Sequence, residues 1–380
     1  MPIQEYFSSS YAEARPKFVD AARNGQAELV SYRLPGYSGP GGEDLAVDVA
    51  RLRSANARNL FLIISGTHGV EGFAGSGCQV GFFNDQLYEA LPPYTGAILI
   101  HALNPFGFAW LRRVNEDNVD LNRNFQDFTK PLPLSRDYDL CHKMLVPDDW
   151  DGPKRKEADA ALSKYIADNG PRVLQAAISG GQYSHSDGLF YGGIQKSWSH
   201  RTFHQILIDH VSSDIENIAV LDLHTGLGPT GYGEPIYLAT SGETFDLAKS
   251  WYGPSVTSPA KGDSVSANVT GTVADALRMA LPNAQTIYIA LECGTVAVME
   301  VLTALRADNW LHAVADQQSP LAQSIKAQIR AALYVDTSYW KAAVFGRFAD
   351  FVVRASRGLA TCNSKKVGLC AICRVLCPNA

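Results

Sequence analysis

The run at residues 61–72, Phe-Leu-Ile-Ile-Ser-Gly-Thr-His-Gly-Val-Glu-Gly, constrains the fold more than any other stretch of this chain. Its apolar part has the length of a buried strand, and it stops just before His68 and Glu71. Open α/β sheets place their chemistry at the carboxyl ends of their strands. An imidazole and a carboxylate at this spacing can bind one divalent cation if a third ligand comes from elsewhere in the chain. Taken alone, the same pair can equally be two polar residues that cap a helix.

Two later apolar runs also end in polar side chains. Residues 217–223 lead into His224, and residues 286–292 end at Glu292. His224 therefore supplies the missing third ligand, again at the carboxyl end of a predicted strand. A carboxylate at the end of a buried strand is unusual, and for Glu292 the structural alternative is a cap on the helix expected from residue 296.

A dense group of polar residues follows another predicted strand, at residues 97–103. Residues 104–125 contain three arginines and five asparagines. Such residues are costly to bury and are not needed at this density for solubility, so we expect them to line a polar pocket.

The motifs in this region resemble the zinc carboxypeptidase superfamily. They are Asn-Pro-x-Gly at residues 104–107, Arg-x-Asn at 113–115 and Val-Asp-Leu-Asn-Arg-Asn-Phe at 119–125, with His-x-x-Glu upstream in the same order. The superfamily has the carboxypeptidase A-like fold and includes the aspartoacylase and succinylglutamate desuccinylase branch. The resemblance covers about residues 53–295.

The resemblance implies a role for each matching residue. It implies one zinc ion per chain, held by His68, Glu71 and His224. It implies that Glu292 is the general base, that Arg113 stabilises the oxyanion, and that Asn122 and Arg123 hold the substrate carboxylate, with Arg112 as a further substrate-binding candidate. Arg113 fits the Arg-x-Asn spacing better than Arg112 does.

We therefore expect zinc-dependent hydrolysis of an amide bond next to a free carboxylate, in a small molecule or a short peptide. Digestive carboxypeptidases have a pocket tyrosine about two dozen residues before the base, and residues 268–273 contain none. Both a carboxypeptidase-like and an N-acyl amino acid deacylase-like activity therefore stay open. A third possibility is a binding protein that keeps the zinc pocket but has weak or no activity.

Two other classes of protein, dinucleotide-binding proteins and serine hydrolases, fit the sequence poorly. Residues 226–231, from Gly226 to Gly231, match G-x-G-x-x-G after a strand, but Pro229 and the residues that follow do not open a helix for a dinucleotide pyrophosphate. No serine lies in the G-x-S-x-G pattern of serine hydrolases.

The pattern of the whole chain predicts an α/β fold, with residues 1–356 as a single domain built on a mixed, mostly parallel sheet flanked by helices. Residues 35–42 are rich in glycine and proline and predict a turn. Residues 131–193 form an insertion, helical at 156–178, whose loop 180–193 could cover the pocket or be an ordinary Ω-loop. Its weak site candidates are Tyr183, His185 and Tyr191. The pair His200 and His204 is expected on a solvated helix face.

The net charge limits the possible partners, and the first and last residues of the sequence carry two further expectations. The chain has 380 residues and a net charge of -5, so neither nucleic acid nor an anionic membrane is expected as a partner. The first residues lack the pattern of a signal peptide, which predicts a cytoplasmic protein. Residues 357–380 carry Cys362, Cys370, Cys373 and Cys377 at a spacing unlike that of a zinc ribbon, and we expect a disordered or non-native extension there.

Overall fold

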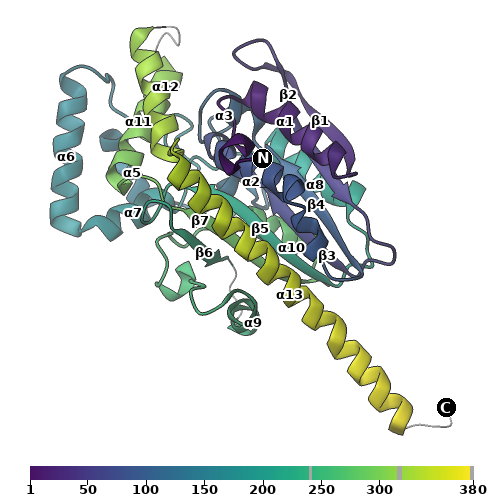
Figure 1. The fold of residues 1–380 in the computed structure, drawn as a ribbon. Coiled ribbons are helices and arrows are strands. Elements are labelled where there is room, and N and C mark those ends of the chain that lie inside the picture. Colours follow the sequence, from purple (N-terminus) through teal and green to yellow (C-terminus); the bar gives the residue numbers. More distant parts are fainter. Residues whose placement is uncertain (239–241, 315–318, 377–380) are drawn as a thin grey trace.

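A seven-stranded mixed sheet crosses the described part of the chain in the order β1-β2-β4-β3-β5-β7-β6 (Figure 1). The structure is a computed structural model that describes residues 1–238, 242–314 and 319–376. The strands are β1 Glu28–Ser38, β2 Asp44–Leu52, β3 Asn59–Ile64, β4 Thr95–His101, β5 Asn217–Thr225, β6 Gly233–Tyr237 and β7 Gln285–Cys293. The pairings make β1, β3, β4, β5 and β7 run in one direction and β2 and β6 in the other. The predicted α/β class with a mixed, mostly parallel sheet is confirmed.

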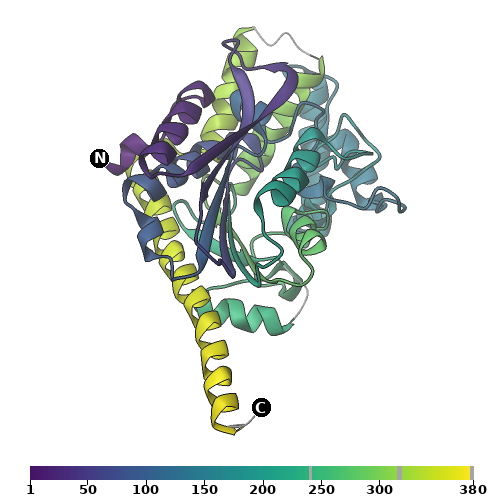
Figure 2. The same cartoon turned by 90° about the vertical axis from the view of Figure 1, so that its right-hand side faces the viewer.

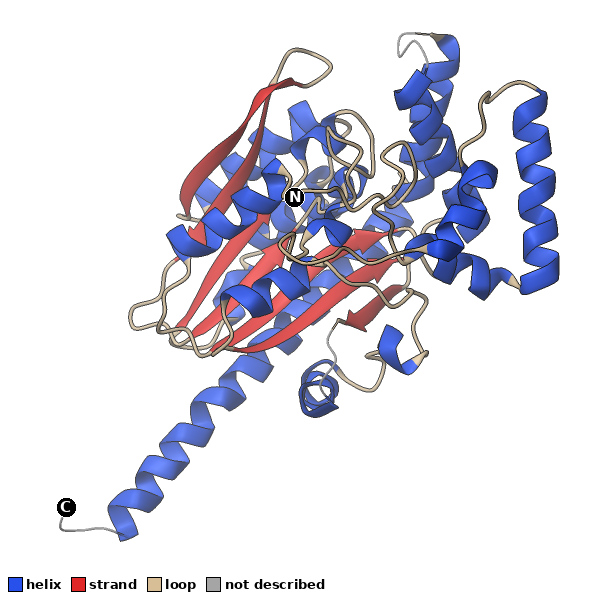
Figure 3. Cartoon of the chain, turned by 180° about the vertical axis from the view of Figure 1, so that it is seen from behind, coloured by secondary structure: helices blue, strands red, loops and turns tan. Residues whose placement is uncertain are grey.

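Helices cover both faces of this sheet because its central strands are apolar on both sides. On β3, Phe61 and Ile63 join the core beneath one layer of helices, whereas Leu60 and Leu62 join the core on the opposite face. The long helix α13 lies on the first face and α8 and α10 on the second, as Figures 2 and 3 show. The helices are α1 Tyr11–Asn24, α2 Gly72–Asn84, α3 Pro105–Ala109, α4 Leu121–Asn124, α5 Arg136–Leu145, α6 Pro153–Asn169, α7 Pro171–Ser179, α8 Trp198–His210, α9 Gly242–Tyr252, α10 Val273–Ala280, α11 Val298–Val314, α12 Pro320–Leu333 and α13 Ser338–Leu376.

The turn after β3 is held in place by close backbone packing. Gly66 has a φ of 65°, a conformation that favours glycine. A Cβ on Gly69 would lie 2.0 Å from the carbonyl carbon of Gly107 in α3. The backbone at residue 69 can therefore approach α3 only because it has no side chain, and this contact fixes His68 at the carboxyl end of β3.

Two local expectations were wrong. β1 continues through Pro35 to Ser38, with a register shift after Arg33, because an edge strand tolerates proline. The helix predicted at 156–178 is two helices, α6 and α7, because Gly170 has a φ of 89° and Pro171 begins the second. The insertion, expected to be helical at 156–178, also contains helix α5 before that stretch. The sequence also predicts a strand at residues 234–240; β6 ends at Tyr237, and residues 239 and 240 lie outside the described residues.

The boundary expected at residues 356 and 357 falls inside helix α13. Leu359 is fully buried, and a Cβ on Gly358 would collide with the Trp251 ring, so this part of the helix packs onto the domain. The backbone stays helical to Leu376, where we had expected a disordered or non-native extension, while Cys377 lies outside the described residues. None of the helices in the described part of the chain combines the length and the apolarity of a membrane span.

Candidate metal centre and catalytic pocket

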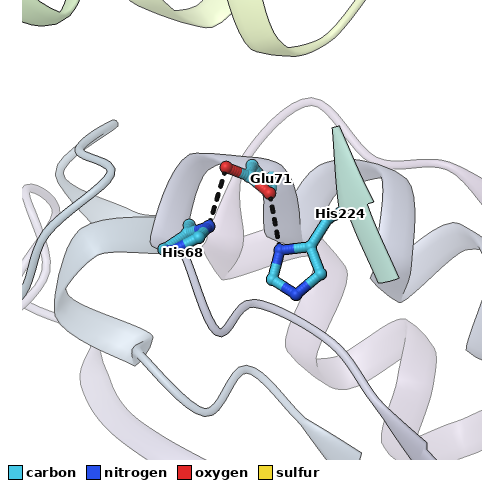
Figure 4. A group of neighbouring side chains, drawn as sticks. All are labelled: His68, Glu71 and His224. Atoms are coloured by element: carbon cyan, nitrogen blue, oxygen red, sulfur yellow. Dashed lines mark hydrogen bonds and ion pairs between the residues drawn. The ribbon is translucent and has the colours of Figure 1, made fainter. Parts of the chain in front are cut away.

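Three predicted metal ligands meet at the carboxyl edge of the sheet. His68 follows β3, Glu71 ends the short 3-10 helix Gly69–Glu71, and His224 lies near the end of β5. One ligand atom from each of the three lies within 4.8 Å of the other two, and all three residues are buried. The carboxylate of Glu71 lies between the two rings, 3.0 Å from His68 Nδ1 and 3.2 Å from His224 Nδ1 (Figure 4).

Each histidine is oriented by a buried aspartate on its other nitrogen. His68 Nε2 lies 3.1 Å from Asp120 Oδ1, and His224 Nε2 lies 2.8 Å from Asp222 Oδ2. An aspartate that accepts the Nε2 proton leaves Nδ1 with its lone pair free, as in the carboxylate–histidine–metal arrangement. In both histidines Nδ1 is instead turned toward the carboxylate of Glu71. The donor set of two imidazoles and one carboxylate fits a zinc ion.

Asp222 is itself fixed by two hydroxyl groups. Thr67 Oγ1 donates to its Oδ1 at 2.9 Å, and the Tyr288 hydroxyl donates to its Oδ2 at 2.5 Å. Burial would lower the pKa of His224, but the carboxylates of Asp222 and Glu71 raise it well above its usual value. A metal ion at Nδ1 would compete with a proton for the same lone pair.

Glu292 lies beside these ligands, in the register position of β7 that faces His224 of β5. Its Oε1 accepts a hydrogen bond from Leu227 N at 3.0 Å, and the residue lines the same pocket as the two histidines. Burial, followed by the negative charge of Glu71, raises the pKa of Glu292 to about 7. A carboxylate with a pKa near neutrality is well matched to taking and returning a proton.

The two adjacent arginines point in different directions. Arg113 donates to Glu71 Oε1 at 2.9 Å and to Asp120 Oδ2 at 3.1 Å, so its guanidinium lies among the metal ligands. Its Nη2 is also 2.9 Å from His68 Nε2, but that nitrogen cannot accept from Arg113 while it donates to Asp120. We place the Nε2 proton of His68 in the hydrogen bond to Asp120, because Asp120 is buried and ionised. Burial alone would raise the pKa of Asp120, but Arg113 and His68 hold it well below its usual range.

Arg112, expected among the substrate-binding residues, lies away from the catalytic pocket. It is buried, and it donates to Asp308 Oδ2 at 3.0 Å and to Asn118 Oδ1 at 2.9 Å. Of the two candidates for the oxyanion, only Arg113 faces the pocket that holds the metal ligands.

Asn122 and Arg123 line the pocket, as expected for residues that hold a substrate carboxylate. Arg123 donates through Nε and Nη2 to the Ser179 carbonyl, at 3.0 and 2.5 Å, and through Nη1 to the Asn122 carbonyl at 2.9 Å. A guanidinium has five N–H donors, so one on Nη1 and one on Nη2 are left to bind a carboxylate. Asn122 Oδ1 accepts from Val273 N at 3.0 Å, which ties this part of the pocket to α10.

The loop at residues 180–193 reaches the pocket through Phe190, which lies under both Arg113 and Arg123. Of the weak candidates, Tyr183 donates to the Arg123 carbonyl at 2.7 Å, whereas His185 and Tyr191 are not among the residues that line the pocket. His200, also buried, lies 2.9 Å through Nδ1 from the Asn124 carbonyl, so it is not on a solvated face.

A second group, His142, His185 and Asp187, has the spacing for a metal ion. The two imidazole rings stack at 3.9 Å with an angle of 18° between their planes. Because the lone pairs of an imidazole lie in the ring plane, parallel rings cannot converge on one ion without turning. The stacked pair is better explained as packing between α5 and the loop.

Sequence reasoning missed Asp120, Asp222, Thr67 and Tyr288. A signal was present for Asp222, because residues two apart on a strand point to the same face, so a buried aspartate two positions before His224 is placed to contact it. The partners of this aspartate, Thr67 and Tyr288, come from distant parts of the chain and give no local signal.

Comparison with known proteins gives a family and several similar folds. A family model described as "Protein of unknown function (DUF2817)" matches residues 7–347. Bovine thrombin-activatable fibrinolysis inhibitor, solved in complex with tick carboxypeptidase inhibitor, is 12% identical with a TM-score of 0.48, covering 93% of this chain and 98% of that one. Carboxypeptidase A from Helicoverpa armigera is 13% identical with a TM-score of 0.42, covering 86% and 74%. Murein-tripeptide amidase from Escherichia coli O157 is 14% identical with a TM-score of 0.34, covering 78% and 91%. No curated protein matches the sequence.

Proposed function

This chain belongs to the DUF2817 family, and we propose that it is a zinc-dependent hydrolase of an amide bond next to a free carboxylate. The observation that carries the proposal is the pair of buried histidines, His68 and His224. Each directs Nδ1 toward Glu71 and Nε2 toward a buried aspartate. A helix-capping role for His68 and Glu71 would not need the second histidine or either aspartate.

The chemistry would be shared between the ion and the residues of the chain. A zinc ion held by His68, Glu71 and His224 supplies Lewis acidity and lowers the pKa of a water molecule to about 7. Glu292 accepts the proton of the attacking water, whose oxygen forms a bond to the carbonyl carbon. The C–N bond then breaks, and Glu292 returns the proton to the leaving amine, so that an acid and an amine are released.

Arg113 and Arg123 would divide the charged groups of the substrate between them. Arg113 lies beside the metal ligands, where negative charge develops on the carbonyl oxygen, and loss of one such donor typically costs about 10² to 10³ in rate. Arg123 offers its two remaining donors to the substrate carboxylate. A binding protein without turnover would not need a base, and the presence of Glu292 beside His224 favours an enzyme.

The Glu292→Gln variant tests the proposal. Glutamine keeps the size of the side chain and can still accept the hydrogen bond from Leu227, but it cannot take a proton at neutral pH. We expect zinc content measured by mass spectrometry to stay at one ion per chain, while hydrolysis of N-acyl amino acids and dipeptides falls by at least about 10². His224→Ala should lose the ion as well as the activity.

Two results would contradict the proposal. Wild-type turnover in Glu292→Gln would remove Glu292 from the mechanism. A purified chain that takes up no zinc would remove the hydrolase altogether.

A further inference from the structure

A second cavity, of about 230 Å³, opens beside the catalytic pocket. We call it the apolar annex; helices α7 and α11 form most of its wall, through residues such as Leu174, Ile178, Val298, Met299 and Leu302. The annex and the catalytic pocket share Ser179, Phe190, Leu227, Val301 and Leu305 as lining residues. The two cavities therefore adjoin at these five residues.

The annex is built to exclude polar groups. Eleven of the fourteen residues that line it are apolar. Of the other three, Arg172 is exposed, Gln175 donates its amide to the Val265 carbonyl at 2.8 Å, and the Ser179 carbonyl is already bound by Arg123.

Part of the annex lining is exposed to water. Val298 is 52% exposed and Met299 is 40% exposed, whereas Val301 and Leu305, which also line the annex, are buried. A contiguous apolar surface of this kind commonly marks a binding site. Because the annex shares five lining residues with the catalytic pocket, the occupant that fits is part of the substrate.

The catalytic pocket has apolar lining residues of its own that can receive the leaving amino acid. Ile236, Leu238 and Val269 line this pocket but not the annex, and Thr272, which also lines it, precedes Val273, whose N–H donates to the Asn122 side chain. The side chain of the residue whose carboxylate is held by Asn122 and Arg123 therefore has its own space. What remains for the annex is the other half of the substrate, which carries the carbonyl carbon.

We propose that the annex binds a hydrocarbon group on the acyl side of the scissile amide. This inference rests on the proposed function and narrows it to substrates whose acyl half is apolar. An apolar cavity of about 150 Å³ holds one benzene ring, so about 230 Å³ has room for an aromatic side chain or a medium-length acyl chain. The hydrocarbon can come from a fatty acyl group or from an apolar amino acid.

The test is a series of N-acyl-L-alanines with straight acyl chains of about two, four, six and eight carbons. Burying one methylene stabilises binding enough to raise kcat/KM by roughly threefold to fourfold. We expect kcat/KM to rise by about that factor per methylene and to level off when the annex is full. Acetyl-Phe-Ala compared with acetyl-Gly-Ala separates an amino acid side chain from a fatty acyl group as the source.

Two variants with one matched control locate the effect. Met299→Asp places a charge in the annex, and Leu302→Trp fills the annex with a larger side chain. The control is Met279→Asp, which makes the same substitution as Met299→Asp at a 56% exposed methionine on α10. We expect Met299→Asp and Leu302→Trp to bring the ratio of kcat/KM between the octanoyl and the acetyl substrate closer to one. Met279→Asp should behave as the wild type.

The inference would be overturned if kcat/KM did not change with the length of the acyl chain, or if Met299→Asp left that change as large as in the wild type. It would also be overturned if kcat/KM depended on the amine-side residue instead of the acyl group. If the protein hydrolyses none of these compounds, the proposed function fails, and calorimetry of the same series still decides the inference. Tighter binding of octanoyl-alanine than of acetyl-alanine, lost in Met299→Asp, would uphold it, and equal binding would overturn it.

Discussion

Asp222→Asn should weaken zinc binding without removing a single ligand. In the wild type the carboxylate accepts from Thr67, from Tyr288 and from His224 Nε2. Asparagine keeps the shape of the side chain but has no charge. If its NH2 group faces Thr67, its carbonyl oxygen can still accept hydrogen bonds from Tyr288 and His224. The main loss is then the negative charge that makes His224 a better ligand.

The expected loss is 10-fold to 100-fold in zinc affinity, the usual effect of removing such an outer partner, or about 1.4 to 2.7 kcal/mol. The measurement is a zinc titration of the chelator-stripped protein in competition with a fluorescent zinc chelator. Circular dichroism provides the control for folding. Tyr288→Phe removes only one hydrogen bond to Asp222 and should reduce the affinity by a smaller factor.

A wild-type dissociation constant in Asp222→Asn would refute this reasoning, provided that His224→Ala loses the metal in the same assay. If Asp222→Asn does not fold, Tyr288→Phe decides instead. A folded Tyr288→Phe protein that binds zinc more tightly than the wild type would show that the hydroxyl does not support the ligand.

Three further predictions concern the pocket, the turn before it and acid stability. Arg123→Ala should raise KM by about tenfold or more for substrates with a free carboxylate and leave amidated analogues unchanged, as steady-state kinetics would show. Gly69→Ala should lower the free energy of unfolding by about 1 to 3 kcal/mol in denaturant titrations, because its methyl group would collide with Gly107. Burial lowers the pKa of His101 from 6.5 to about 4, so the folded protein keeps this ring neutral while the unfolded chain protonates it. Stability should therefore fall by about 3 kcal/mol as the pH drops from 6.5 to 4, and His101→Gln should lose correspondingly less over that range.

The convergence of His68, His224 and Glu292 was predictable because the pattern that reveals a buried strand also shows where it ends. β3 and β5 pair in parallel, and so do β5 and β7, which brings their carboxyl ends to one edge of the sheet. His224 and Glu292 even occupy facing register positions. An apolar run with a polar residue at its end carries that information without any knowledge of tertiary contacts.

The directions of Arg112 and Arg113 could not be predicted in the same way. Both follow the short helix α3, and the sequence offers no periodicity that separates them. The partner of Arg112 is Asp308, 196 positions later in the chain, and only the packing of α11 brings the two together. The division of the insertion into α6 and α7 was predictable in principle, since Gly170 and Pro171 together end a helix.

The charges of the site argue for a divalent cation independently of ligand spacing. Four carboxylates, those of Glu71, Asp120, Asp222 and Glu292, are gathered there, and the catalytic pocket is lined by only two arginines. Burying such an excess of negative charge is costly unless something compensates it. Burial would lower the pKa of His224, but the carboxylates of Asp222 and Glu71 raise it, and burial followed by the charge of Glu71 raises the pKa of Glu292. One doubly charged cation at His68, Glu71 and His224 would offset this excess of negative charge.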